Sequence, residues 1–149
     1  MNSNQPDYLK YWRVIRYFIK AKYGLTQSDL DILLFLNSES YFSRSKFEEF
    51  DELLGWDKTR FAKLVREGWI DTFRRRTPGR RALYKLSYKT ERVIKSIYDK
   101  LSGQEIPMSP SANPMFAKNV KYTDKVYRNM IKDMNKTTRR QQHLAHESQ

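Results

Sequence analysis

Residues 74–81 contain five arginines at a point where the chain reverses direction. They flank the sequence Thr77-Pro78-Gly79-Arg80, in which proline at the second position and glycine at the third are typical of a type II turn. Neighbouring guanidinium groups repel one another unless an anion lies between them, and phosphates are anions that guanidinium groups bind well. The cluster therefore predicts a polyanionic partner, and contact with an acidic protein surface or simple solubility are the alternatives. The five residues are Arg74, Arg75, Arg76, Arg80 and Arg81.

A second group of polar and basic side chains lies just before this hairpin. Phe61, Leu64 and Val65 share one face at helical spacing, which predicts a helix at 57–67 with Asp57 as its N-cap. Lysine and arginine can donate to a guanine edge, and threonine can contact a thymine methyl group. The residues left outside the apolar stripe are therefore candidate base contacts, with an ordinary solvated helix face as the alternative. They are Lys58, Thr59, Arg60 and Lys63.

The preceding helix, predicted at 43–54, carries opposite charges at its two ends. Its first residues can hold phosphate groups at a helix N-terminus, and these are Ser43, Arg44, Ser45 and Lys46. Its later residues are acidic, and these are Glu48, Glu49, Asp51 and Glu52. In a helix-turn-helix this element crosses the phosphate backbone. The acidic part must then point away from a duplex, or the partner is a protein.

Local signals predict the elements that position these side chains. Thr26, Ser43 and Asp57 are each an N-cap preceded by an apolar residue that pairs with one inside the helix. These hydrophobic staples are Leu25 with Leu30, Phe42 with Phe47, and Trp56 with Phe61. The predicted helices are 7–23, 26–37, 43–54, 57–67 and 88–101, the last capped by Ser87, and the predicted strands are 69–75 and 81–86.

The C-terminal part has a different composition. Residues 103–120 contain three prolines and predict a linker, and the spacing within 121–136 predicts an amphipathic helix followed by a polar tail. The apolar line of that helix is Tyr122, Val126, Met130 and Met134. This helix has too little around it to form its own core. We therefore expect it to dock, together with the strongly apolar first helix, on its own chain, on a second copy or on another protein.

Composition limits the possible functions. The 149 residues carry a net charge of +12, and the absence of cysteine excludes disulfides and thiolate chemistry. Residues 71–87 hold six basic residues and one acidic, whereas residues 25–70 hold six basic and nine acidic. His143 and His146 have no further ligand nearby, and no phosphate loop or nucleophile motif occurs. We therefore expect no enzyme activity, no metal and no cofactor.

No apolar run approaches the roughly 18 residues needed to cross a bilayer, and the first ten residues, MNSNQPDYLK, do not have the layout of a signal peptide. We therefore expect no membrane association and a cytoplasmic location, with a virion or another nucleoprotein particle as the alternative.

The order of elements predicts a mainly α fold with a small β-hairpin, that is, a winged helix-turn-helix followed by a linker and an amphipathic helix. We expect a winged-helix domain at 1–102, a linker at 103–120, and a docking helix with a polar tail at 121–149. Residues 8–101 resemble the MarR and PadR families of winged-helix regulators. The segments that carry the resemblance are LTQSDLDILLFL at 25–36, FAKLVREGWI at 61–70 and GRRALYKLS at 79–87.

The resemblance implies a dimer that inserts the 57–67 helix into the major groove of double-stranded DNA. The chemistry of its arginines separately predicts that the hairpin lies on the backbone or in the minor groove. MarR-type proteins often hold a small aromatic effector as well. Our first hypothesis is a dimeric transcription regulator. The second is a structural or adaptor component of a nucleoprotein assembly, for example a phage particle, that uses the hairpin and the C-terminal arm for non-specific DNA or protein contacts.

Overall fold

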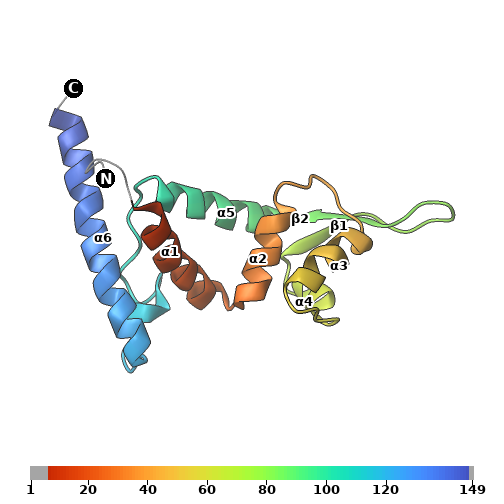
Figure 1. The fold of residues 1–149 in the computed structure, drawn as a ribbon, viewed down its shortest axis with the longest axis horizontal. Helices are drawn as coiled ribbons and strands as arrows, with labels where there is room; N and C mark the ends of the chain where they lie inside the picture. Colours follow the sequence, from red (N-terminus) through yellow and green to blue (C-terminus); the bar gives the residue numbers. More distant parts are fainter. Residues whose placement is uncertain (1–6, 148–149) are drawn as a thin grey trace. The chain divides into compact units, whose positions relative to one another are not determined.

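The computed structural model describes residues 7–147 and separates into two compact units (Figure 1). One unit is Leu25–Lys95, and the other combines Met1–Gly24 with Ser96–Gln149. Helices dominate the described residues and a single two-stranded hairpin accompanies them, so the predicted mainly α fold with a β-hairpin is confirmed. The expected division at 1–102, 103–120 and 121–149 concerns which parts fold independently, and it stays a prediction.

Three helices open the Leu25–Lys95 unit: α2 (Gln27–Leu36), α3 (Arg44–Leu53) and α4 (Arg60–Arg66). Thr26 and Asp29 form a reciprocal capping box at the start of α2, and the Ser43 hydroxyl accepts a hydrogen bond from the Lys46 N–H at the start of α3. These caps satisfy amide groups that have no partner within the helix. The predictions for α2 and α3 are confirmed to within a residue.

The prediction for α4 is wrong at its start, because the helix begins at Arg60 and not near Asp57. The Asp57 carboxylate accepts hydrogen bonds from the backbone N–H and the hydroxyl of Thr59, at 2.9 and 2.6 Å. These bonds close a tight turn that leaves Lys58 and Thr59 before the helix. Trp56, which was expected to pack on Phe61 as a hydrophobic staple, is 60% exposed.

The hairpin pairs β1 (Ile70–Arg74) with β2 (Leu83–Leu86) in antiparallel register. Phe73 is an extra residue in β1, since Thr72 pairs with Tyr84 and Arg74 with Leu83, and such a bulge bends the strand. The strand ends at Arg74. Strand alternation would place Arg74 and Arg76 on one face and Arg75 on the other. Because Arg75 and Arg76 lie beyond the strand, that alternation does not apply to them.

The hairpin is tied to the helices at Phe42, the residue before the α3 cap. Phe42 and Tyr84 exchange two backbone hydrogen bonds of 2.9 and 2.8 Å. The Phe61 ring meets both the Phe47 ring, at 5.0 Å, and the Tyr84 ring, at 4.8 Å, edge to face. These contacts fix α3 and α4 against β2. At the hairpin tip Gly79 has a φ of 76°, as the predicted turn requires.

The helix α5 (Tyr88–Leu101) follows the hairpin and begins in the same unit. The predicted Ser87 cap is confirmed, because its hydroxyl accepts from the Thr90 N–H at 3.2 Å. Thr90 in turn donates its hydroxyl to the carbonyl of Trp69 at 2.7 Å, which ties the start of α5 to the residue before β1.

The second unit is built from α1 (Tyr8–Tyr23), the end of α5, the short helix η1 (Pro114–Phe116) and α6 (Tyr122–Glu147). Tyr17 of α1 stacks on Tyr127 of α6 with 3.9 Å between ring centres, and its hydroxyl donates to Asp124 at 2.5 Å. Burial and this hydrogen bond raise the pKa of Tyr17 to about 12. The C-terminal helix therefore docks on the first helix of its own chain.

The segment at 103–120, expected as a linker, packs closely on α6. Ile106, Asn113 and Met115 are each at most 2% exposed. Asn135 of α6 exchanges two hydrogen bonds of 2.9 Å with the backbone of Ile106, and Arg128 donates to the carbonyl of Met115. These bonds explain how polar side chains of α6 can lie at its buried face.

The predicted apolar line of α6 is wrong in part. Tyr122 is 81% exposed and Val126 is 41% exposed. The residues of α6 that are buried are instead Ile131, Met134, Asn135 and Thr138. The predicted polar tail is also helical as far as Glu147, and residues 148 and 149 lie outside the described part of the chain. Gln142 donates to the carbonyl of Gly103 at 3.1 Å, which gives this last stretch a tertiary contact.

Within residues 7–147, no helix is both long enough and apolar enough to cross a membrane. Residues 1–6 of the N-terminal segment that was compared with a signal peptide lie outside the described residues.

Candidate nucleic-acid interface

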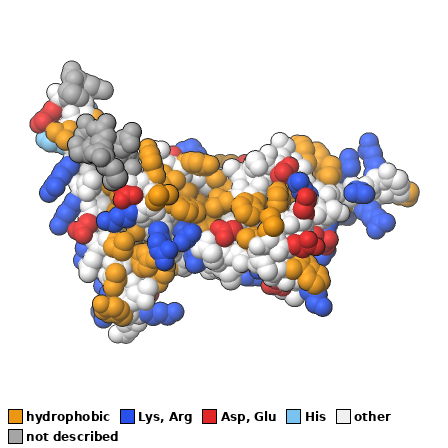
Figure 2. Space-filling view, viewed as in Figure 1, with side chains coloured by type: hydrophobic (Ala, Val, Ile, Leu, Met, Phe, Trp, Pro, Cys, Tyr) orange, Lys and Arg blue, Asp and Glu red, His pale blue; other side chains and the backbone are white. Residues whose placement is uncertain are grey.

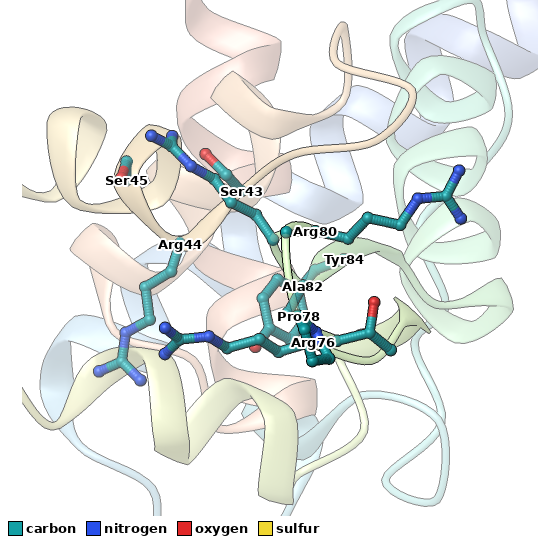
Figure 3. Close-up of a pocket in the computed structure, with 11 residues that line it drawn as sticks. Ser43, Arg44, Ser45, Arg76, Pro78, Arg80, Ala82 and Tyr84 are labelled. Atoms are coloured by element: carbon teal, nitrogen blue, oxygen red, sulfur yellow. The ribbon is translucent and has the colours of Figure 1, made fainter.

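An open groove of about 920 Å³ lies between the start of α3 and the β1–β2 hairpin (Figure 3). It brings together the Ser43–Ser45 segment and the hairpin tip, which are about thirty residues apart in the sequence. Four of its lining residues are arginines and none is an aspartate or glutamate. The lining is Ser43, Arg44, Ser45, Arg76, Thr77, Pro78, Gly79, Arg80, Arg81, Ala82 and Tyr84.

Arg44 is held in place on the helix side of the groove. Its guanidinium lies over the Phe61 ring, 4.5 Å from the centroid, and is 3.4 Å from the Glu48 carboxylate. Stacking of this kind leaves the edges of the guanidinium plane able to donate hydrogen bonds. Figure 3 shows the Arg44 and Arg76 side chains extending toward the same part of the groove from its two walls.

The remaining hairpin arginines have two roles. Arg74 donates to the carbonyl of Arg81, with its Nη2 at 3.1 Å, and this bond braces the hairpin where the β-pairing ends. Arg75, Arg76, Arg80 and Arg81 are exposed. Figure 2 shows the resulting concentration of positive side chains at the hairpin tip. Arg75 is the one exposed hairpin arginine that does not line the groove.

The acidic part of α3 is largely neutralised within the unit. Arg44 pairs with Glu48, and Lys46 pairs with Glu49 at 3.2 Å. Asp51 is 1% exposed and pairs with Arg60, and only Glu52 of this acidic group has no ion pair among the described residues. The negative charge that the sequence places beside the arginines is therefore directed inward or compensated.

Arg60 is not a candidate base contact, which corrects the prediction from the sequence. It is 7% exposed and donates to both Asp29 and Asp51. Lys63 donates to Asp29 at 2.7 Å and keeps a 30% exposed side chain. Burial acts to raise the pKa of Asp29, but hydrogen bonds from Lys63 and Thr26 outweigh it and hold this pKa below its usual value. The same bond to Asp29 raises the pKa of Lys63.

The outward side of α4 is formed by residues three and four apart. Thr59, Ala62 and Arg66 are exposed and Lys63 is partly exposed, while Lys58 is exposed in the turn before the helix. Sequence reasoning missed Arg66. The signal was present, because Arg66 follows Thr59 by seven positions and so lies on the same side of a helix.

Residues 7–147 contain no group of three or more His, Asp or Glu side chains placed to hold a metal ion. His143 instead lies 3.0 Å from Glu147.

No protein-family model matches the chain, and a comparison with curated protein sequences also finds no match. Among solved structures, the chain is similar to AbfR of Staphylococcus epidermidis, with 13% identity, coverage of 87% of this chain and 80% of that chain, and a TM-score of 0.43. It is also similar to a mutant MarR from E. coli complexed with operator DNA, with 14% identity, 84% coverage of both chains and a TM-score of 0.44.

A third similar structure is reduced AbfR bound to DNA, with 17% identity, coverage of 82% of this chain and 84% of that chain, and a TM-score of 0.42. The second of these proteins carries the name of one of the two families that the sequence resembles. Because all three TM-scores lie below 0.5, the function of this chain has to be argued from its own residues.

Proposed function

We propose that this chain is a DNA-binding transcription regulator of the winged-helix type. The observation that carries the proposal is the groove between α3 and the hairpin, which four arginines line and no carboxylate enters. Guanidinium groups placed in this way bind phosphate oxygens, and the hydroxyls of Ser43 and Ser45 can donate to the same oxygens. The groove would hold one strand of a duplex by its backbone.

The outward side of α4 would then supply the sequence readout. Thr59, Ala62 and Arg66 are exposed there and present a methyl-bearing, a small and a bidentate side chain. Such side chains suit the major groove, where each good bidentate contact discriminates between bases by about 1–3 kcal/mol. Lys58 and Lys63 add positive charge beside them. Arg75, on the hairpin but outside the groove, would contact a neighbouring phosphate or the minor groove.

We further propose that two copies associate through α1 and the 121–136 segment. Leu9 is 84% exposed on α1, and Tyr122 and Val126 leave apolar surface on α6. Apolar side chains of this size favour contact with a second chain over contact with water. A two-fold dimer would place two reading helices on one duplex, as paired half-sites require.

The decisive experiment is a selection from random duplexes, followed by binding of the selected duplex and of random duplex at two salt concentrations. A regulator should prefer its selected duplex by about 10³-fold or more. Arg80→Ala should weaken binding to both duplexes and flatten the salt dependence, because Arg80 would contact phosphate. Arg66→Ala should mainly reduce the preference. Lys85→Ala, an exposed cation on β2 outside the groove, is the matched control and should change neither.

A second candidate function is an adaptor that contacts another protein. The observation that favours it is the α3–α4 turn, where Leu53 is 75% exposed and Trp56 is 60% exposed. Two large apolar side chains at one turn are unusual on a surface that contacts only nucleic acid. Equal affinity for every duplex, or no binding to DNA at all, would reject the regulator and favour the adaptor.

A further inference from the structure

The unit that contains α1 and α6 carries a row of cations beside Tyr122 and Val126, the α6 side chains that the proposed dimer uses, and the proposed function gives these cations no role. Five cations on α6 or just before it are exposed: Lys121, Lys125, Lys132, Lys136 and Arg140. On a helix with 3.6 residues per turn they fall within an arc of about 100°, and they extend over about 28 Å. Lys and Arg side chains are visible along α6 in Figure 2. We call these five residues the basic stripe.

The basic stripe is free to meet a partner. No member forms an ion pair with another residue in the 7–147 range. Two neighbouring charges are already engaged, since Arg139 lies 2.6 Å from Glu105 and Asp124 accepts from Tyr17. Asp133 is an exposed carboxylate next to Lys132, so the five cations outnumber the acidic side chain beside them. Repulsion within a row of unpaired cations disfavours the isolated chain, and a row of anions removes that repulsion.

The packing of α6 indicates which polyanion suits it. A helix that lies on a membrane must have a free apolar face to insert between lipid headgroups. Here the apolar residues Ile131 and Met134 are at most 6% exposed, and Asn135 holds the same face to the backbone of Ile106. Tyr122, Val126 and Leu144 are exposed apolar side chains of α6. Polar and charged residues lie between Val126 and Leu144 on that side, so these side chains do not form a continuous face that could insert.

Lysines dominate the basic stripe, whereas arginines dominate the hairpin. Lysine is a point charge on a flexible stem and binds phosphate without the fork geometry that reads a guanine edge. Duplex DNA carries one negative charge per about 1.7 Å of axis, so about 28 Å of helix can face several phosphates at once. The lysine composition therefore favours phosphate contact without base recognition.

We infer that the basic stripe of α6 is a second nucleic-acid surface, which contacts the phosphates of duplex DNA independently of sequence. The inference deepens the proposed function, because it takes DNA as the partner and adds a contact outside the groove and the α4 face. Such a surface raises affinity for every duplex and leaves the preference among duplexes unchanged.

The test uses the full chain and a random-sequence duplex, with affinity measured by fluorescence anisotropy over a range of salt concentrations. The stripe variant combines Lys125→Gln, Lys132→Gln and Lys136→Gln. Its control removes the same charge from exposed positions outside α1, α4, α6 and the groove, namely Lys85→Gln, Arg92→Gln and Lys118→Gln. A wing variant combines Arg76→Gln and Arg80→Gln.

Losing three phosphate contacts should lower the magnitude of the log–log salt slope by about 2.7, at about 0.9 per contact, and should weaken binding about tenfold or more. The control should change the slope by less than about 1. A stripe variant that behaves like the control overturns the inference. The proposed function still holds in that case if the wing variant weakens binding. Failure of the inference can therefore be distinguished from failure of the proposed function.

The membrane alternative is tested on vesicles of phosphatidylserine and phosphatidylcholine at the same salt concentrations. We expect the stripe variant and the unmodified protein to bind these vesicles equally, or not to bind them at all. Vesicle binding that the stripe variant abolishes, together with unchanged DNA affinity, would overturn the inference in favour of a lipid surface.

Discussion

Replacing Arg60 with alanine should destabilise the protein strongly and leave DNA contacts untouched. Arg60 donates to two carboxylates, Asp29 at 2% exposure and Asp51 at 1%. Removing one partner of a buried ion pair typically costs about 3–5 kcal/mol, because a charge is left unpaired away from water. Both carboxylates keep another donor, since Lys63 donates to Asp29 and the Asp57 N–H donates to Asp51.

We therefore expect a loss near the lower end, about 3 kcal/mol in the free energy of unfolding. At about 2–4 °C per kcal/mol for a chain of this size, the melting temperature should fall by roughly 6–12 °C. Urea unfolding followed by circular dichroism at 222 nm measures the first quantity, and a thermal scan measures the second. Arg66→Ala on the outward side of α4 is the control, and its unfolding free energy should change by less than about 0.5 kcal/mol.

A double-mutant cycle makes the test sharper. Asp51→Ala, Arg60→Ala and the double variant should show a coupling free energy of about 1–3 kcal/mol, as residues in direct contact do. A loss of less than about 1 kcal/mol for Arg60→Ala, together with a weakening of DNA binding as large as that of Arg80→Ala, would contradict this prediction. That result would mean that the Arg60 side chain faces the partner and not the core.

Three further predictions concern the charged and polar contacts of the two units. Lys63→Met should lower the free energy of unfolding by about 1.5–3 kcal/mol at pH 7. Because the pKa of Asp29 is lowered and that of Lys63 is raised, this loss should shrink as pH falls below about 4 or rises above about 10.5. Urea titrations at a series of pH values measure the change. Tyr17→Phe should remove one tyrosine ionisation near pH 12 from the ultraviolet titration. In the unmodified protein, the contact of Tyr17 with Asp124 should contribute about 1 kcal/mol to the free energy of unfolding. That contribution should be fully present below pH 10 and lost as pH approaches 12. Asn135→Ala should lower the unfolding free energy by about 2 kcal/mol or more, because the backbone N–H and carbonyl of Ile106 lose their partner. The Ile106 amide hydrogen should then exchange faster with solvent.

The elements that the sequence predicts well are those with local causes. Thr26 and Ser43 cap α2 and α3 through amides only three residues away, so the pattern can be read without knowing the tertiary structure. Gly79 provides the positive φ of the hairpin turn for a similarly local reason. The arginines that line the groove were expected to bind an anion because arginine clusters are visible in a linear sequence, and that role stays a prediction.

The failures have tertiary causes. Arg60 precedes Leu64 by one helical turn, so it lies on the buried side, but its partners Asp29 and Asp51 are 31 and 9 residues away. A linear pattern does not show that the tertiary structure places two buried carboxylates beside a cation. The groove itself depends on the Phe42–Tyr84 pairing, which joins segments that no local signal connects.

The same limit explains α6. Its most apolar line predicts burial of Tyr122 and Val126, yet the buried line includes Asn135 and Thr138. Asn135 is buried because Ile106 offers it both a donor and an acceptor, and no helical periodicity encodes that partner. Polar residues at a buried face are therefore the positions where a periodicity argument is weakest.

The way α4 is fixed has a consequence for protein engineering. A helix of seven residues is too short to persist by itself in water, so Arg60, Phe61 and Leu64 hold its conformation from the inner side. Among the described residues, no side-chain contact of Ala62 or Arg66 holds the helix in place. The Thr59 side chain bonds to Asp57, in the turn before the helix. Positions 62 and 66, with Lys58 in the turn, can therefore be randomised as a combinatorial library on an unchanged scaffold.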